Sequence, residues 1–274
     1  MTTRTRRYRL RQVSVLAAAL LCVGAVACAD PGAATPERTS TGGVPIPPSY
    51  HYVAGDEFDG SALDTSKWRA YDSLSSNQVS HFRPSQVTQS GGELRIVGHG
   101  RDSSGAANVS GAACWCGTGG NQTYGIWAVK AKLDAGKGYA PAMLLWPQSN
   151  RWPTDGETDI IETVQPKRIS DVASVHWGDP PNGQRESGKT WGDFTRWHIF
   201  WVDWQPDYIR IYVDRTLVYD STTSTKNPVI PSKPMHLVLQ QEPGPYAPDV
   251  WLPAPDASTP DQVVMHIDWV RYYH

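Results

Sequence analysis

The sequence predicts an all-β sandwich or barrel from about residue 50 to the C-terminus. After the first 49 of its 274 residues, the chain is a series of short segments in which apolar and polar residues alternate. Alternation with period two is typical of half-buried strands, and segments with a helical period and capping residues are absent. Gly, Pro, Asn and Asp separate the segments, as the turns of an all-β fold require. The predicted strands include residues 93–98, 124–133, 173–177, 198–204, 208–213, 236–239 and 263–273.

Residues 1–29 are predicted to be an export signal. Five arginines and no acidic residue accompany an apolar stretch, residues 13–26, that is too short for a comfortable membrane span. The small residues before Cys28 fit an ordinary cleavage site, and they also resemble a bacterial lipobox in which Cys28 is lipidated. We place a cell-surface lipoprotein ahead of a freely secreted protein, because a Cys at that junction is otherwise a coincidence.

The rest of the chain is expected to comprise a disordered linker, residues 30–49, and one catalytic domain, residues 50–274. The linker is rich in Pro, Gly, Thr and Ala and poor in large apolar residues. Without the arginines of the export signal, 20 basic residues stand against 27 acidic ones, a formal charge of −7. An acidic protein is unsuited to nucleic acid or anionic membranes. We therefore expect membrane contact only through a lipid anchor, and a monomer.

Three acidic residues, Glu157, Asp159 and Glu162, lie among β-branched residues in one predicted strand. Like charges this close should push one pKa up and leave another low, as a general acid and a nucleophile require. In a regular strand Glu157 and Asp159 share a face, but Glu162 is an odd number of positions away from both and faces the other side. We therefore predict a β-bulge between Asp159 and Glu162, which would turn all three to one side. The alternative is a charged edge strand without chemistry.

The run from Trp152 to Glu162 resembles the active-site signature of glycoside hydrolase family 16, in its bulged, laminarinase-type branch. The domain opening at residues 56–60 and the ending at residues 266–273 also resemble this family, so the resemblance spans residues 52–273. It implies a concanavalin-like β-jelly-roll sandwich of two curved antiparallel sheets. The substrate cleft would then lie on the concave face.

The resemblance implies a retaining endo-glycosidase that hydrolyses β-1,3- or mixed β-1,3/1,4-glucan through a covalent glycosyl-enzyme. Glu157 would be the nucleophile, Glu162 the general acid and base, and Asp159 an assisting residue that shares a proton or hydrogen bond with Glu157. No cofactor is required. Three alternatives stay open: a transglycosylase, a hydrolase of an agarose-type or bacterial exopolysaccharide, and a lectin without turnover.

Several side chains near the acids are candidates for substrate binding. The chain has 12 Trp against 4 Phe, and flat rings with a polar atom suit the faces of sugars. Trp146 and Trp152 are candidate sugar platforms, with a core role as the alternative for each. Arg151 would bind a hydroxyl or be solvated, and His176 would donate to a carboxylate or be packed. Trp115 completes the set of candidates.

Cys114 and Cys116 are the cysteines that remain after processing. Pairs this close seldom form a disulfide of good geometry, so we expect free or bridged loop cysteines beside Trp115. By resemblance, Asp268 is a candidate ligand of a structural calcium ion, which prefers six to eight oxygen ligands. A capping or ion-paired Asp is the alternative.

Two departures from the family pattern bear on substrate choice. Ala128 and Lys130 stand where the family usually has Glu and Arg, and residues 240–246 replace a loop of small residues. We expect both regions to shape the cleft.

Overall fold

The computed structural model describes residues 43, 46–101, 107–246 and 251–274. The predicted export signal, with Cys28, and most of the predicted linker lie outside these residues. Regular structure in the described part consists of eighteen strands and two 3₁₀ turns, η1 (Pro84–Gln86) and η2 (Ser221–Thr223), so the all-β prediction is confirmed. Within the same part, no helix has the length and apolar character that crossing a membrane demands.

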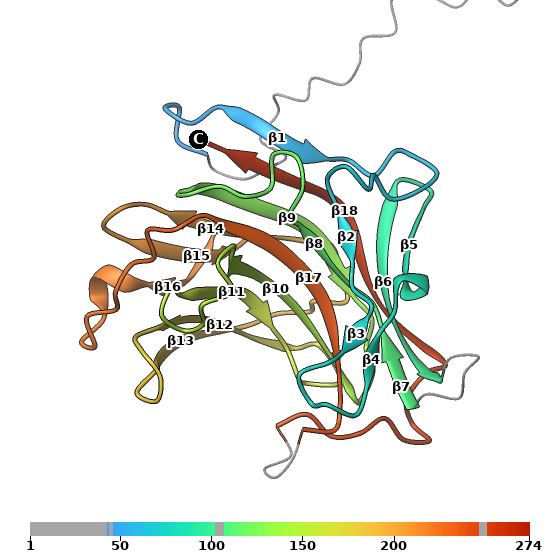
Figure 1. The fold of residues 1–274 in the computed structure, drawn as a ribbon. Helices are drawn as coiled ribbons and strands as arrows, with labels where there is room; N and C mark the ends of the chain where they lie inside the picture. Colours follow the sequence, from blue (N-terminus) through green and yellow to red (C-terminus); the bar gives the residue numbers. More distant parts are fainter. Residues whose placement is uncertain (1–42, 44–45, 102–106, 247–250) are drawn as a thin grey trace, which may run out of the picture. The chain divides into compact units, whose positions relative to one another are not determined.

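Two sheets of antiparallel strands make up the fold, apart from one short parallel pair (Figure 1). The first sheet contains β1 (Tyr52–Asp56), β3 (Ser73–Leu74), β4 (His81–Phe82), β5 (Val87–Ser90), β6 (Glu93–Arg101), β7 (Ala107–Ser110), β9 (Gly125–Leu133), β14 (His198–Trp204), β15 (Ile209–Val213), β16 (Thr216–Asp220) and β18 (Gln262–Tyr273). The second contains β2 (Arg69–Ala70), β8 (Ala112–Trp115), β10 (Tyr139–Pro147), β11 (Glu157–Glu162), β12 (Ser170–Trp177), β13 (Gln184–Trp191) and β17 (Met235–Pro243), in the order β13-β12-β11-β10-β17-β8-β2.

Alternation along the central strands decides which side chains enter the core between the sheets. In β10, Met143 and Leu145 join that core, whereas Ala142 and Leu144 join a small apolar cluster on the outer face of the second sheet. Successive side chains of a strand point to opposite faces, so this one strand supplies both the core and the outer surface.

The outer face of the first sheet is covered by the beginning of the domain. Ile46, Tyr50 and Tyr52 pack there against a cluster that includes Ala128. Lys130 shares this outer face, because it alternates with core residues of β9. The expectation that Ala128 and Lys130 shape the cleft is therefore wrong, since they belong to the other sheet and to its far side.

The cysteine pair is bridged. Cys114 and Cys116 form a disulfide, and Cys114 lies in β8 instead of in the expected loop. Cys114 faces the apolar cluster of the second sheet's outer face, together with Leu144 and Val238, while Trp115 points into the core. The bridge therefore packs against the apolar cluster on the outer face of the second sheet.

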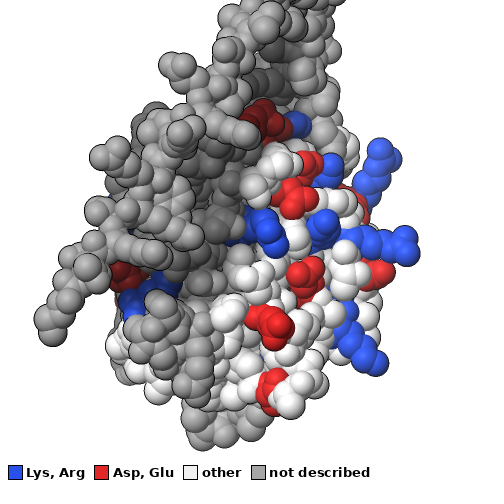
Figure 2. All heavy atoms as spheres, turned by 90° about the vertical axis from the view of Figure 1, so that its right-hand side faces the viewer, with Lys and Arg blue, Asp and Glu red and all other residues white. Residues whose placement is uncertain are grey.

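Charged side chains are mixed on the face that Figure 2 shows. Lys and Arg side chains stand between Asp and Glu side chains, and no stripe of one sign forms among the described residues of this face. The described residues of this face therefore lack the stripe of basic side chains that is typical of nucleic-acid-binding surfaces.

Candidate active site

A cleft of about 1090 Å³ crosses the outer face of the second sheet. It runs from Arg185 in β13, over the acidic residues of β11, to residues 69–74 at the opposite edge. The floor between them includes Leu144 and Val238 from the apolar cluster. A concave surface of this kind, apolar with a few convergent polar groups, is the usual form of a ligand site.

The predicted β-bulge is present in β11. Against β12, Asp159 pairs with Ser174 and the next pair is Glu162 with Val172, so two residues of β11 stand opposite one of β12. The pairing with β10 shifts at the same place. Ile160 and Ile161 are both fully buried in the core as a result. The extra residue restores the parity of the strand, and Glu157, Asp159 and Glu162 all line the cleft.

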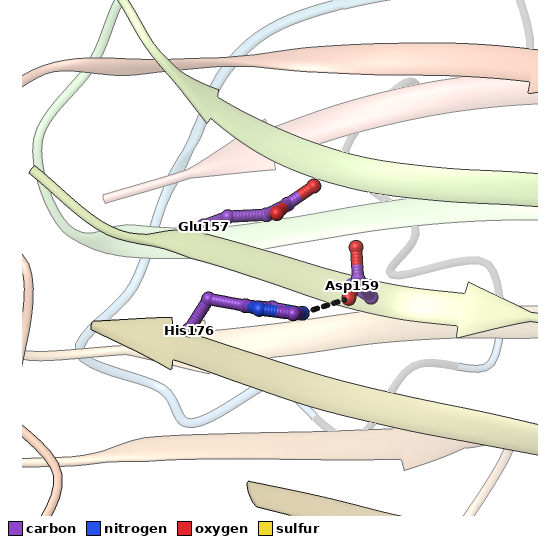
Figure 3. A group of neighbouring side chains, drawn as sticks. All are labelled: Glu157, Asp159 and His176. Carbon is purple, nitrogen blue, oxygen red and sulfur yellow. Dashed lines mark hydrogen bonds and ion pairs between the residues drawn. The ribbon is translucent and has the colours of Figure 1, made fainter. Parts of the chain in front are cut away.

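Neighbouring groups hold the acids in place. Figure 3 shows Glu157 and Asp159 on β11 and His176 on β12, with His176 Nε2 3.1 Å from Asp159 Oδ2. The indole N–H of Trp152 donates to Glu157 Oε2 at 2.6 Å. On the far side of the bulge, Arg185 Nη2 lies 3.7 Å from Glu162 Oε2. Each acidic residue thus has a partner of its own, which limits its rotamers.

The cleft favours the protonated forms of the three acids. Burial raises the pKa of Glu157 to about 8, and the charge of Asp159 adds to the effect. Burial also raises the pKa of Asp159 and of Glu162, while the guanidinium of Arg185 opposes it at both. The expectation of one low pKa is not met in the free cleft, because burial outweighs the favourable partners. Burial therefore favours protonation of each acid, and the three titrate together.

Asp159 and Glu157 share their hydrogen bond. The Asp159 side chain is 4% exposed, and its hydrogen bond with Glu157 lowers the pKa of Asp159, whereas the charge of Asp159 raises the pKa of Glu157. The Trp152 N–H and the nearby His176 favour the charged form of Glu157. The two carboxyl groups are therefore coupled, and a proton lost by one is held more tightly by the other.

Asp171 is a residue of the site that the sequence analysis missed. It is fully buried in β12, on the core-facing side that it shares with Ala173 and Val175. Its Oδ1 accepts a hydrogen bond from the backbone N–H of Glu162 at 3.1 Å, and its Oδ2 has no hydrogen-bond partner. Asp171 therefore supplies an acceptor for an amide at the bulge. The available signal was an Asp two residues before the predicted strand 173–177, in phase with its core-facing residues Ala173 and Val175.

Both predicted sugar platforms line the cleft. Trp152 is 46% exposed, and Trp146 is partly buried with its indole N–H donating to Asn150 Oδ1 at 2.9 Å. His176 lines the cleft as well. These three residues stay predictions as substrate contacts.

Two other predicted contacts are corrected by the structure. Trp115 is fully buried between the rings of Trp68 and Trp127, with centroids 6.0 and 5.7 Å away, so it cannot touch a ligand in the cleft. The Arg151 side chain is 68% exposed outside the cleft lining, with the nearest carboxylate, of Asp155, at 4.0 Å. The Arg151 side chain is therefore solvated, which was the alternative to binding a substrate hydroxyl.

The carboxylate of Asp268 forms an ion pair. Its Oδ2 lies 2.7 Å from Lys130 Nζ, so the structure favours the ion-paired alternative, and calcium binding at Asp268 stays a prediction. Among the described residues, the side chains of Glu157, Asp159 and His176 form one group of metal-ligand type, with ligand atoms within 4.8 Å of one another. A metal would require both carboxyl groups to be ionised, and burial raises the pKa of each.

Comparison with known proteins adds a family match. Residues 101–271 match the sequence profile described as "Glycosyl hydrolases family 16". The chain is 28% identical to a "Beta-glucanase" of Rhodothermus marinus over 195 residues, which cover 63% of the chain and 65% of the relative. It is 28% identical to a "Keratan-sulfate endo-1,4-beta-galactosidase" of Sphingobacterium multivorum over 62% of the chain and 43% of that protein. The chain spans less than two thirds of the length of these curated relatives.

Solved structures confirm the jelly-roll fold. The laminarinase catalytic domain of Thermotoga maritima superimposes with a TM-score of 0.69 at 23% identity, over 82% of this chain and 98% of that one. A "non-specific endo-beta-1,3(4)-glucanase", SCLam, gives a TM-score of 0.72 at 25% identity, over 84% of this chain and 97% of the other. The prediction of a sandwich of two curved sheets, made from the resemblance, is therefore confirmed.

Proposed function

The chain belongs to glycoside hydrolase family 16, a family of retaining enzymes, and from this premise we propose that it is an endo-glycosidase acting on β-1,3- or mixed β-1,3/1,4-glucan. The observation that carries the proposal is the bulge in β11, because it brings three acids to one side of an open cleft. A lectin would have no use for that arrangement. The names of two relatives, a "Beta-glucanase" and a "Glucan endo-1,3-beta-glucosidase A1", support glucan as the substrate.

In the first step, the Glu157 carboxylate attacks the anomeric carbon, and the bond from that carbon to the glycosidic oxygen breaks. Glu162 gives its proton to the departing oxygen, so the leaving sugar departs as a neutral alcohol. The raised pKa of Glu162 suits this role, since the group must arrive protonated. Retention requires carboxyl groups about 5–5.5 Å apart.

In the second step, the ionised Glu162 removes a proton from water, and the resulting hydroxide oxygen bonds to the anomeric carbon. The ester bond to Glu157 breaks, and the carboxylate is regenerated. Two inversions give net retention. Asp159 assists by taking up the proton of its hydrogen bond with Glu157, so that Glu157 attacks as a carboxylate, and His176 Nε2, 3.1 Å from Asp159 Oδ2, holds Asp159 in place. If a sugar replaces the water, the same residues perform transglycosylation.

We also propose that the enzyme works outside the cell, as a lipoprotein or a secreted protein. The support is the signal-like composition of residues 1–29 and the Cys at the cleavage junction.

The test measures reducing ends released from laminarin, mixed-linkage β-glucan, agarose and cellulose, with the anomer followed by NMR. We expect one of the two β-glucans to be cleaved with the β-anomer formed first, and Glu157→Gln to abolish release while thermal unfolding stays unchanged. Cleavage of agarose alone, or an initial α-anomer, would overturn the proposal. Binding without release from any polymer would favour the lectin.

A further inference from the structure

Glu242 is a fourth buried acid in the cleft, and the reaction does not use it. It lies in β17, is 3% exposed and lines the same cleft as the three acids of β11. Ala142 of β10 pairs with Glu162 on one side and with Gln240 on the other. Glu242 follows Gln240 by two residues, so it lies on the same face of the sheet, two strands away from Glu162.

The contacts of Glu242 leave part of its carboxylate available. Its Oε1 accepts from Ser76 Oγ at 3.1 Å and from the Tyr246 hydroxyl in a short hydrogen bond. The donor to Oε2 is Gln240 Nε2 at 3.3 Å, which is longer than the usual N–H···O range. Ser75 also donates to this carboxylate, so the long contact from Gln240 is the one that a hydroxyl donor of a ligand would replace at Oε2.

Aromatic rings surround this end of the cleft. Tyr246 and Trp251 contact each other edge to face with centroids 5.1 Å apart, and Tyr71 and Phe82 do so at 6.3 Å. All four line the cleft with Glu242. A pyranose presents C–H groups to aromatic faces and hydroxyl donors to a carboxylate, so the combination fits a sugar unit some distance from the cleaved bond.

Charge restricts which sugar this end of the cleft accepts. Glu242 shares the cleft with the acids of β11, and the charge of Glu162 adds to burial in raising the pKa of Glu242 to about 7. A sugar carboxylate or sulfate here would bring another negative charge to a poorly solvated place, at a cost that disfavours binding. Two cationic side chains line the cleft: Arg185 pairs with Glu162, and Arg69 lies on the edge strand β2 beside Tyr71.

We propose that Glu242, with Tyr246 and Ser76, forms a subsite that binds a neutral sugar through its hydroxyl groups and rejects uronic acid and sulfated sugars at that position. The inference rests on the proposed polysaccharide substrate and adds the charge class of one of its sugar units.

A purely structural role for Glu242 makes a different prediction. Glu242 also joins the segment around Ser76 to Tyr246, but Asn77 Nδ2 joins the same two segments by donating to the carbonyls of Pro243 at 2.8 Å and Pro245 at 3.2 Å. Glu242→Gln removes the charge and keeps an acceptor oxygen for Ser76 and Tyr246, while its NH2 group takes the place of the Oε2 that accepts from Gln240. A structural role therefore predicts that this variant treats neutral and anionic ligands as the wild type does.

The experiment uses two ligands that differ only at C6: neutral β-1,3-gluco-oligosaccharides, and the same oligosaccharides in which the C6 hydroxymethyl group is oxidised to a carboxylate, which gives glucuronic acid units. Binding is measured by calorimetry at pH 8 on the full chain carrying Glu157→Gln, with and without Glu242→Gln, and kcat/KM is measured on the corresponding polymers with Glu157 intact. We expect the neutral ligand to bind about tenfold more tightly than the oxidised one, and Glu242→Gln to remove most of this preference.

Asp72→Asn is the matched control, because Asp72 lines the same cleft and its exposed carboxylate pairs with Arg83 at 3.0 Å. An equal loss of preference in this variant would assign the effect to overall charge and overturn the subsite. Unchanged preference in Glu242→Gln, or tighter binding of the oxidised ligand through Arg69, would overturn it as well. If the wild type neither binds nor cleaves neutral β-glucan, the proposed glucanase fails too; cleavage with unaltered selectivity overturns only the subsite.

Discussion

Replacing Asp171 by Leu or by Asn tests whether the bulge amide positions the general acid. Asp171→Leu removes the acceptor of the Glu162 N–H and leaves that buried amide without a partner, which costs about 1–3 kcal/mol. The local backbone can recover this only by moving, and a displacement of about 1 Å at a catalytic group costs on the order of 100-fold in rate. Asp171→Asn keeps an acceptor oxygen in the same place.

We therefore expect Asp171→Leu to lower kcat about 100-fold with KM unchanged, and Asp171→Asn to lower it only a few-fold. The assay is initial-rate kinetics on the glucan that the wild type cleaves, with thermal unfolding and near-UV circular dichroism to establish that both variants are folded. The reasoning would be refuted by a folded Asp171→Leu enzyme with wild-type kcat. Equal losses in the two variants would show that the acceptor is not what matters.

Three further predictions follow from contacts in and near the cleft. Trp152→Phe keeps an aromatic ring and removes the donor to Glu157 Oε2, which should raise the pKa of Glu157 further. The limb of the kcat/KM–pH profile that reports Glu157 should then move to higher pH by about one pH unit, and an unmoved limb would contradict this. Trp115→Ala removes a core side chain and should lower the free energy of unfolding, measured in urea titrations, by about 3–5 kcal/mol. Trp146→Ala removes a side chain of the cleft and should raise KM with little change in stability. The reverse pattern would show that the core role of Trp115 and the substrate-binding role of Trp146 are misassigned. Burial raises the pKa of Glu242 from its ordinary value of 4.5 to about 7, so the folded state binds more protons and loses about 3 kcal/mol of stability as pH rises through this range. Urea titrations at pH 5 and pH 8 should show this loss in the wild type and a smaller one in Glu242→Gln.

Local patterns in the sequence were sufficient to predict those features of the fold and the site that depend on the geometry of a single strand. The bulge follows from the parity of the spacing between Asp159 and Glu162, because all three carboxylates had to reach one face. The predicted segments of β9, β14 and β18 are strands because each alternates core residues with residues of the opposite face. In these cases one strand contains the whole signal.

Features that depend on the pairing of distant strands were not predictable. β13 carries mostly polar residues, since it is the edge strand of the second sheet, and it lacks an apolar stripe. Trp115 and Ala128 were placed near the cleft because the sequence does not say which face, or which sheet, a strand presents. The pairing of Glu242 with Ser76 joins residues 166 positions apart, so no local pattern could indicate it.

The cover that Ile46, Tyr50 and Tyr52 provide has a consequence for how the enzyme meets a polymer. These residues lie on the outer face of the first sheet, and the cleft lies on the outer face of the second, with the whole core between them. Residue 46 therefore lies on the side of the domain opposite the cleft. A long polysaccharide that lies across the cleft does not contact Ile46, Tyr50 or Tyr52.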